Sequence, residues 1–270
     1  MSTTYPRAWA EWTSPDFDTL RHSNQAARAV AVLPVAAVEQ HGPHLPTGVD
    51  TLLIQAMLER ALALLPPELP TPVLPVQAIG LSPEHGAFAG TLSLQPSTVL
   101  ALWQQLGHGV ARSGLRKLLL LNGHGGQASL TDAAARMLRN ECGLTVVTCN
   151  WYQLPMPEAV RALFSEHEHR FGVHAGDMET SIMLALAPQL VRMQHAADFA
   201  STSEQRARTT RVLGNGVSAK LAWQAQDLNP AGAVGNASAA SAPKGQAVLA
   251  AVAQSLAELI QDIAELEPLG

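Results

Sequence analysis

The stretch from Val30 to Asp50 reads VAVLPVAAVEQHGPHLPTGVD and holds the clearest structural signal in the chain. Its first part, Val30–Val38, is a short apolar run that is rich in valine and alanine and bounded by turn residues. Such a run is typical of a buried strand in a parallel sheet. Its last residue, Asp50, begins a helical pattern that continues to Leu65. The sequence therefore predicts a buried strand that is followed by a polar loop and a helix.

The same alternation of strands and helices continues along the chain. Further strands are predicted at Val73–Ile79, Lys117–Leu121 and Leu144–Cys149, and further helices at Ser97–Arg112, Ser129–Cys142 and Thr180–Ala187. Strands that alternate with helices are typical of parallel βαβ units, so the predicted fold class is α/β.

Residues 1–270 are predicted to form a single domain, because the chain shows neither an internal repeat nor a dividing linker. Residues 200–244 are rich in Ser, Ala, Gly and Asn and have weak periodicity, so we expect a long loop region there. The last segment, Gln246–Leu266, is predicted to be one amphipathic helix.

The loop after the first strand carries side chains that suit a metal ion. Glu39 and His41 are two residues apart and share one face if the backbone stays extended, and Asp50 stands at the start of the helix. Ligands are best held where a rigid strand ends, at the carboxyl edge of an open α/β sheet. The stretch therefore predicts a metal site. The alternative is a polar turn in which Asp50 caps the helix and the histidines are solvated.

Two further polar segments carry side chains that could bind a metal ion. Asn122–Gly126 reads NGHGG and places His124 in a glycine-rich turn after a predicted strand. A phosphate-cradling loop is the alternative, although the Gly-Lys-Ser/Thr of a P-loop is absent. His174–Ser181 opens an apolar helix. There His174 is either functional or a surface loop residue, and Glu179 either binds a ligand or serves the helix dipole.

Four motifs together resemble those of the creatininase (creatinine amidohydrolase) family. They are Glu39–Pro46 with Asp50-Thr51 after it, Gly80–Leu94, Asn122–Gly126 and His174–Ser181, and they come in the family's order. The resemblance extends over about residues 6–260, and the conjunction of motifs makes it specific. It implies a three-layer α/β/α fold with a mostly parallel central sheet, usually assembled as a homohexamer.

The resemblance also implies two divalent metal ions per subunit, typically zinc, manganese or iron. Glu39, Asp50 and His124 would hold one metal. His41 and Asp50 would hold the other, with Asp50 as the bridge because a carboxylate has two oxygens to share.

The second metal needs one more carboxylate. In creatininase this Glu lies two residues after the equivalent of His124, but that position is Gly126 here. Other branches of the family take the ligand from the His-Ala-Gly-x-x-Glu motif, which assigns Glu179.

Two metals of this kind can bind one bridging water and lower its pKa toward neutrality. The resulting hydroxide would attack an amide carbonyl, and the amine leaving group would need a proton. His174 is the candidate general acid/base, because an imidazole titrates near neutral pH. Glu84 and His85 are candidates to line the pocket or carry protons; the alternative is a loop with solvated polar residues.

Three residues are candidates for substrate binding. Phe88 and Trp151 would form apolar walls of a pocket, or else belong to the core. In creatininase a Trp-Asp pair stands just before the His-Ala-Gly motif, where this chain has Arg170 and Phe171. Arg170 would favour a substrate carboxylate or phosphate if it faces the pocket, and is otherwise a solvated loop charge.

The sequence therefore predicts an amidohydrolase for a small amide, cyclic amide or formamide. The alternatives are a peptidase like the one that trims the mycofactocin precursor, creatininase proper, and a metal-binding scaffold that has lost catalysis.

Composition sets the remaining limits. A hydrophobic content of 47% is enough for a sizeable core, and 14% charged residues is compatible with subunit interfaces. The net charge of −5 and the lack of basic runs give no electrostatic basis for binding nucleic acid. The two cysteines form neither a disulfide framework nor a CxxC motif. We expect no membrane-spanning stretch and no signal core, and hence a cytoplasmic enzyme.

Overall fold

Three parallel strands form the central sheet of the computed structural model, which describes residues 4–215 and 218–267. They are β1 (Val30–Val35), β2 (Lys117–Asn122) and β3 (Thr145–Asn150), side by side in this order. The register places Val30 opposite Lys117 and Lys117 opposite Thr145, so the three strands end at the same edge. The predicted parallel α/β sheet is confirmed, with small shifts in the strand ends.

Alternate residues of the strands point into two separate hydrophobic cores, as the two-residue period of a strand requires. One core contains Val30, Val32, Leu119 and Leu121, and the other contains Ala31, Leu33, Leu118 and Leu120. The first core is covered by α2 (Val49–Leu64), α7 (Asp177–Leu186) and α10 (Ala242–Glu265), and the second by α3 (Pro96–Arg112) and α4 (Ala128–Cys142).

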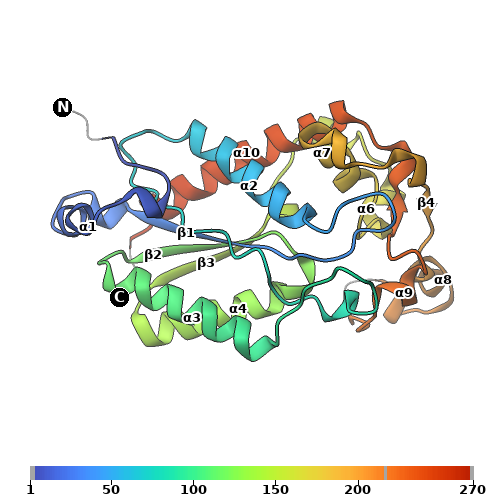
Figure 1. The fold of residues 1–270 in the computed structure, drawn as a ribbon, viewed down its shortest axis with the longest axis horizontal. Coiled ribbons are helices and arrows are strands. Elements are labelled where there is room, and N and C mark those ends of the chain that lie inside the picture. Colours follow the sequence, from blue (N-terminus) through green and yellow to red (C-terminus); the bar gives the residue numbers. More distant parts are fainter. Residues whose placement is uncertain (1–3, 216–217, 268–270) are drawn as a thin grey trace.

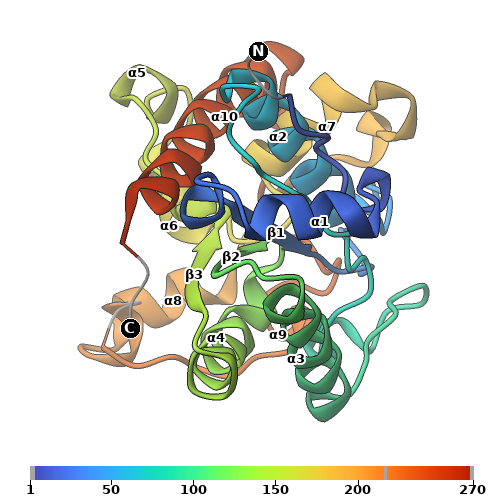
Figure 2. The same ribbon diagram turned by 90° about the vertical axis from the view of Figure 1, so that its left-hand side faces the viewer.

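Figure 1 shows these helical layers on opposite faces of the sheet, and Figure 2 shows the same layering after a turn of 90°. The predicted three-layer α/β/α architecture is therefore confirmed. The long helices also end near the predicted residues: Gly143 follows α4 with a φ of +66°, the left-handed conformation that glycine favours after a helix. The shorter helices are α1 (Ser14–Arg21), α5 (Glu158–Arg161), α6 (Glu166–Phe171), α8 (Thr202–Thr209) and α9 (Ala225–Leu228).

Residues 70–77 lie beside β1 without forming the regular strand that was predicted at Val73–Ile79. The backbone of Val32 donates to the carbonyl of Pro72 at 3.0 Å and accepts from Leu74 at 2.9 Å, so the two segments run side by side. Prolines interrupt the segment and have no N–H to donate to a ladder. Isolated bridges join it to β1 instead, and the prediction of a regular strand here is wrong.

Residues 200–244 do not form one long loop, so this prediction is also wrong. Within the described part of the chain, the region contains α8, α9 and β5 (Gly235–Asn236), which pairs antiparallel with β4 (Asp198–Phe199). Residues 216 and 217 of the predicted loop lie outside the described residues. Helix α10 begins at Ala242 rather than Gln246, with a proline in its first turn. Helices α8 and α9 and strands β4 and β5 escaped prediction because each is too short to show a periodic pattern.

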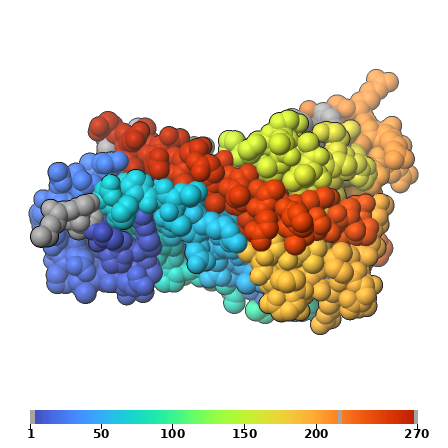
Figure 3. Space-filling model, turned by 90° about the horizontal axis from the view of Figure 1, so that it is seen from above, coloured from blue at the N-terminus to red at the C-terminus, as the bar shows by residue number. Residues whose placement is uncertain are grey.

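Helix α10 is long and apolar enough to cross a membrane by length and composition, a stretch that the sequence prediction overlooked. It packs against α2 and α7, however, and Val248, Leu249, Val252 and Leu256 are fully buried on its inner face. Figure 3 shows it as a red band along the upper surface of the molecule. Its apolar composition is explained by the core that it completes.

Candidate metal centre

Four side chains predicted as metal ligands meet at the carboxyl edge of the central sheet, where β1 and β2 end. Oε1 of Glu39 lies 3.1 Å from Nδ1 of His124. Oδ1 of Asp50 lies 3.5 Å from Nε2 of His41, and Oδ2 of Asp50 lies 3.6 Å from Nδ1 of His124. Because parallel strands end at one edge, residues far apart in the sequence come together there.

Local structure holds each of these side chains in place. Gly42 has a φ of +67°, a conformation that lets the chain turn directly after His41. The side chain of Asn122 donates to the carbonyl oxygen of His124 at 2.6 Å and accepts from its N–H at 3.1 Å, which closes the turn after β2. Asp50 lies in the first turn of α2, where the helix dipole favours a carboxylate.

The loop before α7 brings His174 and Glu179 to the same edge. Nδ1 of His174 lies 3.8 Å from Oε1 of Glu39. Glu179 is in the first turn of α7, and its Oε2 accepts a hydrogen bond of 2.5 Å from the backbone N–H of Ala175. Ala175 has a φ of +54°, which is unusual for a residue other than glycine and marks the sharp turn between the two side chains.

Three overlapping groups of side chains have donor atoms close enough to share a metal ion. They are Glu39 with Asp50 and His124, His41 with Asp50 and Glu179, and Glu39 with His41 and His174. Within each group the donor atoms all lie within 4.8 Å of one another. Asp50 belongs to the first two groups, as a bridging carboxylate would.

The hydrogen bonding of these residues also fits a divalent cation. Both carboxylate oxygens of Glu39, Nε2 of His41 and Oδ2 of Asp50 are buried and make no hydrogen bond to any described part of the chain. Buried polar atoms are nearly always paired, and an unpaired buried carboxylate is costly. A cation bound among them would satisfy all four atoms.

Backbone carbonyls fix the tautomers of two histidines. Nδ1 of His41 lies 3.0 Å from the carbonyl oxygen of Glu39, which can only accept, so in the neutral ring Nδ1 carries the proton and Nε2 can offer its lone pair beside Asp50. In the same way, Nε2 of His174 donates to the carbonyl oxygen of Gln40 at 2.7 Å, and Nδ1 is left facing the cluster. Each ring therefore aims a lone pair inward.

Close packing shifts the pKa values of these groups. Burial opposes the charged form of His41, but the negative charges of the neighbouring carboxylates, above all that of Asp50, outweigh it and raise the pKa of His41 to about 9. Burial raises the pKa of Glu179 to about 7. Burial, followed by the charges of His41 and His85, lowers the pKa of His174 well below its ordinary value. The cluster thus attracts positive charge, while His174 stays in its neutral form.

His85 joins the cluster through Gln40, a residue that the sequence reasoning did not single out. The amide nitrogen of Gln40 donates to the carbonyl oxygen of Gly232 at 2.8 Å and lies 2.7 Å from Nδ1 of His85. Nε2 of His85 then faces Oε1 of Glu39 at 3.4 Å. The signal that could have found Gln40 is its place in the motif, between two predicted ligands.

Glu84 contacts the cluster through His124. It lies in a 3-10 turn, Pro83–His85, and its Oε1 is 3.2 Å from Nε2 of His124. The structure therefore brings the three predicted catalytic residues and the five predicted metal ligands into one connected, largely buried cluster.

Comparison with known proteins agrees with this geometry. The family described as Creatininase, creatinine amidohydrolase, matches residues 10–260. The chain belongs to the creatininase family. It is 31% identical to creatinine amidohydrolase of Pseudomonas putida, over 88% of this chain and 90% of the relative.

Other relatives are similarly distant in sequence. The chain is 28% identical to a 3-dehydro-scyllo-inosose hydrolase of Thermotoga maritima, over 88% of this chain and 79% of the relative. It is 27% identical to a mycofactocin precursor peptide peptidase of Mycolicibacterium smegmatis, over 86% of this chain and 84% of the relative. A solved creatininase mutant of the Zn–Zn type aligns with a TM-score of 0.74 and 26% identity, covering 97% of this chain and 100% of that one. This protein is thus a metal-dependent hydrolase of the creatininase family.

The three residues predicted to bind substrate lie in different surroundings. Trp151 is buried in the core, and its Nε1 donates to the carbonyl oxygen of Gly123 at 3.2 Å. Phe88 is half-buried three residues after His85. Arg170 is exposed, with its guanidinium 4.9 Å from the ring centre of Phe171. Their part in substrate binding stays a prediction.

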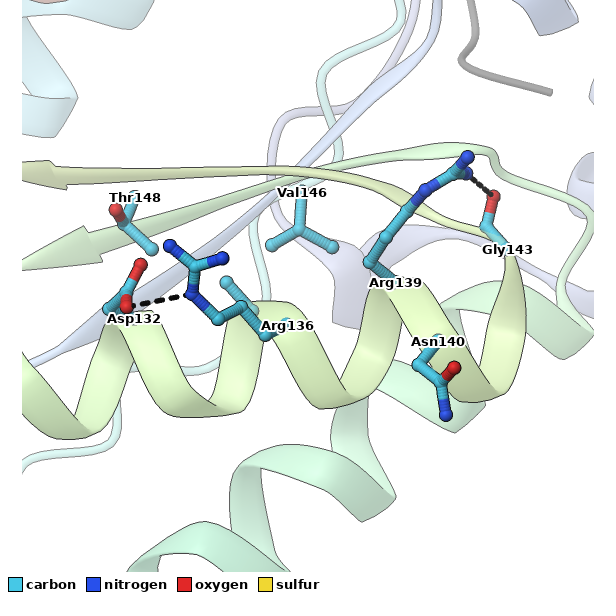
Figure 4. Close-up of a pocket in the computed structure, with 8 residues that line it drawn as sticks. Asp132, Arg136, Arg139, Asn140, Gly143, Val146 and Thr148 are labelled. Atoms are coloured by element: carbon cyan, nitrogen blue, oxygen red, sulfur yellow. Dashed lines mark hydrogen bonds and ion pairs between the residues drawn. The ribbon is translucent and has the colours of Figure 1, made fainter.

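A separate hollow of about 790 Å³ lies along α4 and β3 (Figure 4). Two of its arginines are already paired: Arg136 contacts Asp132 at 3.0 Å, and Arg139 donates to the carbonyl oxygen of Gly143 at 3.1 Å. None of the predicted site residues lines it.

Proposed function

We propose that this creatininase-family protein is a binuclear metal-dependent amidohydrolase that cleaves the C–N bond of a small amide, cyclic amide or formamide. One observation carries the proposal: four buried donor atoms on Glu39, His41 and Asp50 make no hydrogen bond in the described chain and converge with His124 at the sheet edge. A cation among these atoms would supply the partner that they lack.

Two cations fit the donor groups. Glu39, Asp50 and His124 would hold the first, and His41, Asp50 and Glu179 the second, with Asp50 shared between them. When bound, the pair would supply Lewis acidity that activates water and polarises the amide carbonyl. Glu179 thereby takes the place of the carboxylate that Gly126 cannot provide.

His174 is proposed to carry the proton to the leaving amine. Its Nε2–H is held by the carbonyl oxygen of Gln40, and its Nδ1 faces the cluster next to Glu39. The ring is neutral because its pKa is lowered by burial first and by neighbouring imidazoles second. A neutral imidazole can accept a proton from water and pass it on. His85 would assist by orienting the carboxylate of Glu39, which its Nε2 faces at 3.4 Å.

A small substrate is favoured by how enclosed the centre is. Glu39, His41, Asp50 and His124 are all at most 4% exposed. A compact amide needs little room beside such a centre, whereas a peptide needs an open groove. A mycofactocin-type peptidase, creatininase proper and an inactive metal-binding scaffold remain the competing proposals.

The test is the metal content of gently purified protein, measured by elemental analysis, together with hydrolysis of an amide panel by the same sample. The panel holds creatinine, formamidopyrimidines and short peptides. About two metals per subunit and turnover of one class are expected. One metal or none, with no turnover after zinc, manganese or iron is added, would show that the proposal is wrong. Turnover of peptides alone would favour the peptidase.

We also propose that the protein is a homohexamer, because family members usually assemble in this way. Size-exclusion chromatography with light scattering measures the mass of the assembled particle directly. A mass near that of one 28.6 kDa chain would contradict the hexamer.

A further inference from the structure

The carboxylate of Glu84 occupies the space that a side chain at position 126 would need. A methyl group at position 126 would overlap Oε1 of Glu84, and it would lie 2.5 Å from Nε2 of His124. In this chain the lack of a side chain there leaves room for the carboxylate of Glu84 to reach His124.

Glu84 meets only one side of the His124 ring. Oε1 of Glu84 lies 3.2 Å from Nε2, and Oγ of Ser82 lies 3.4 Å from the same nitrogen. The other nitrogen, Nδ1, faces Glu39 and Asp50 at 3.1 and 3.6 Å. The imidazole therefore stands between Glu84 and the donor atoms of the first proposed metal site.

This placement argues against Glu84 as a direct ligand of that site. Its carboxylate belongs to none of the groups whose donor atoms could share a cation. A carboxylate can only accept, however, so it favours the tautomer of His124 in which Nε2 carries the proton and Nδ1 offers a lone pair. A metal-binding histidine commonly gives its other N–H to a carboxylate in this way, which orients the ring and makes it a stronger ligand.

We propose that Glu84 is a positioning residue: it holds the His124 ring and tautomer so that Nδ1 faces the first cation, and Gly126 is required to leave it room. The inference rests on the proposed binuclear centre and deepens it. This role replaces the proton-carrying role that the sequence suggested for Glu84, because Glu84 contacts Nε2 of His124.

The buried surroundings of Glu84 support a fixed orientation. Its side chain is 12% exposed. The turn that carries it is held by a hydrogen bond of 2.9 Å from the N–H of Ser82 to Oγ of Ser93, and by one of 3.2 Å from the N–H of Leu81 to Oε1 of Gln127. Gln127 in turn donates to the side chain of Asn122 at 3.0 Å. The Glu84 turn and the His124 turn are therefore braced against one another.

The test is the affinity of full-length protein for cobalt(II), measured by competition with a chelator, together with the absorption spectrum of the bound ion. Glu84→Ala should weaken the first site by about 10- to 100-fold, the range for loss of a partner that orients a metal ligand. Glu84→Gln keeps an acceptor without the charge and should fall between Glu84→Ala and the unmodified protein. Both variants should still bind two ions at saturation, with an altered cobalt spectrum.

A pair of glycine variants tests the requirement for space. Gly126→Ala should weaken the first site because the new methyl group displaces Glu84 and crowds His124. Gly125→Ala is the matched control on the same turn, because its methyl group would meet only the Tyr152 side chain, at 3.6 Å or more. Circular dichroism of each variant establishes that it has folded.

The outcomes separate this inference from the proposed function. If the unmodified protein binds two ions and Glu84→Ala binds them with the same affinity and spectrum, the positioning role is overturned and the binuclear centre stands. If the unmodified protein binds no ion, both are overturned. Weakened binding in Glu84→Ala that Glu84→Gln partly restores would support the inference.

Discussion

Oε1 of Glu168 accepts a hydrogen bond of 2.6 Å from the backbone N–H of Asp177, the first residue of α7. Oε2 of the same carboxylate accepts from the N–H of Asn236 at 2.9 Å. One buried side chain on α6 thus ties the start of α7 to β5. Added methyl groups at Gly172, Gly176 or Gly235 would run into this carboxylate, so three glycines make room for it. Because α7 carries Glu179 and follows His174, Glu168 supports the candidate centre from outside.

Glu168→Gln should destabilise the fold, although it preserves size. The amide turns one acceptor into a donor that faces a backbone N–H, and a buried group left unpaired costs about 1–3 kcal/mol. Urea unfolding measures the loss, and Glu166→Gln, an exposed change on the same helix, is the control. Activity should fall as well because α7 loses its anchor. Equal unfolding midpoints for the two variants would contradict this role.

Glu179→Ala should reduce the metal content from two ions per subunit to one. Glu179 is the only carboxylate of the second donor group that the first group does not share. Elemental analysis after dialysis measures the content. Glu59→Ala, which removes an exposed carboxylate on α2, should keep both ions. An unchanged content in Glu179→Ala would remove Glu179 from the ligand set.

The sequence could predict the centre because its residues follow strand ends, and parallel strands must end at one edge. The strand-end rule pointed to Glu39 and His41, whereas the assignment of His124 as a ligand came from the resemblance to the creatininase family. The partners of these residues are harder to predict. Gln40 and Glu168 act through contacts with segments far along the chain, and no periodic pattern marks such contacts. Glu84 was named, but its contact with His124 depends on the space at Gly126, which only the folded chain reveals.

The fold also contains elements that the sequence could predict and elements that it could not. Strands β1, β2 and β3 were predicted because each is a continuous apolar run between turn residues. Residues 70–77 misled the prediction, since their apolar character suits a strand while their prolines remove its donors. The elements between 200 and 244 were missed because they are held by tertiary contacts and not by their own periodicity.

His174→Ala should lower kcat by about 10²- to 10⁴-fold, the usual contribution of a general acid–base group, and should leave both metal ions bound. Metal content and kcat are measured on one sample, with His195→Ala as an exposed control. Loss of an ion would instead make His174 a ligand, through the group that it forms with Glu39 and His41.

The pH dependence of stability should differ between metal-free and metal-loaded protein. In the metal-free protein the pKa of His41 is raised to about 9, because Asp50 outweighs the opposing effect of burial. The folded state therefore keeps a proton that the unfolded chain releases above its ordinary pKa of 6.5. This stabilisation is fully present below pH 6.5 and is lost as the pH rises through 9. Glu179, with its pKa raised to about 7 by burial, acts in the same direction between its ordinary 4.5 and 7.

Metal-free protein should accordingly lose thermal stability between about pH 6.5 and 9, by a few kcal/mol at roughly 1.4 kcal/mol per pKa unit. A bound cation uses the lone pair of His41 in place of the proton, so the loaded protein should lack this decline and the gap in Tm should widen as pH rises. Thermal unfolding of both forms across this range measures the gap. His41→Ala removes the titrating group, so its metal-free form should show a flatter curve. Parallel curves for metal-free and loaded protein would mean that His41 is not protonated in the cluster and that its proton does not stand in for the cation.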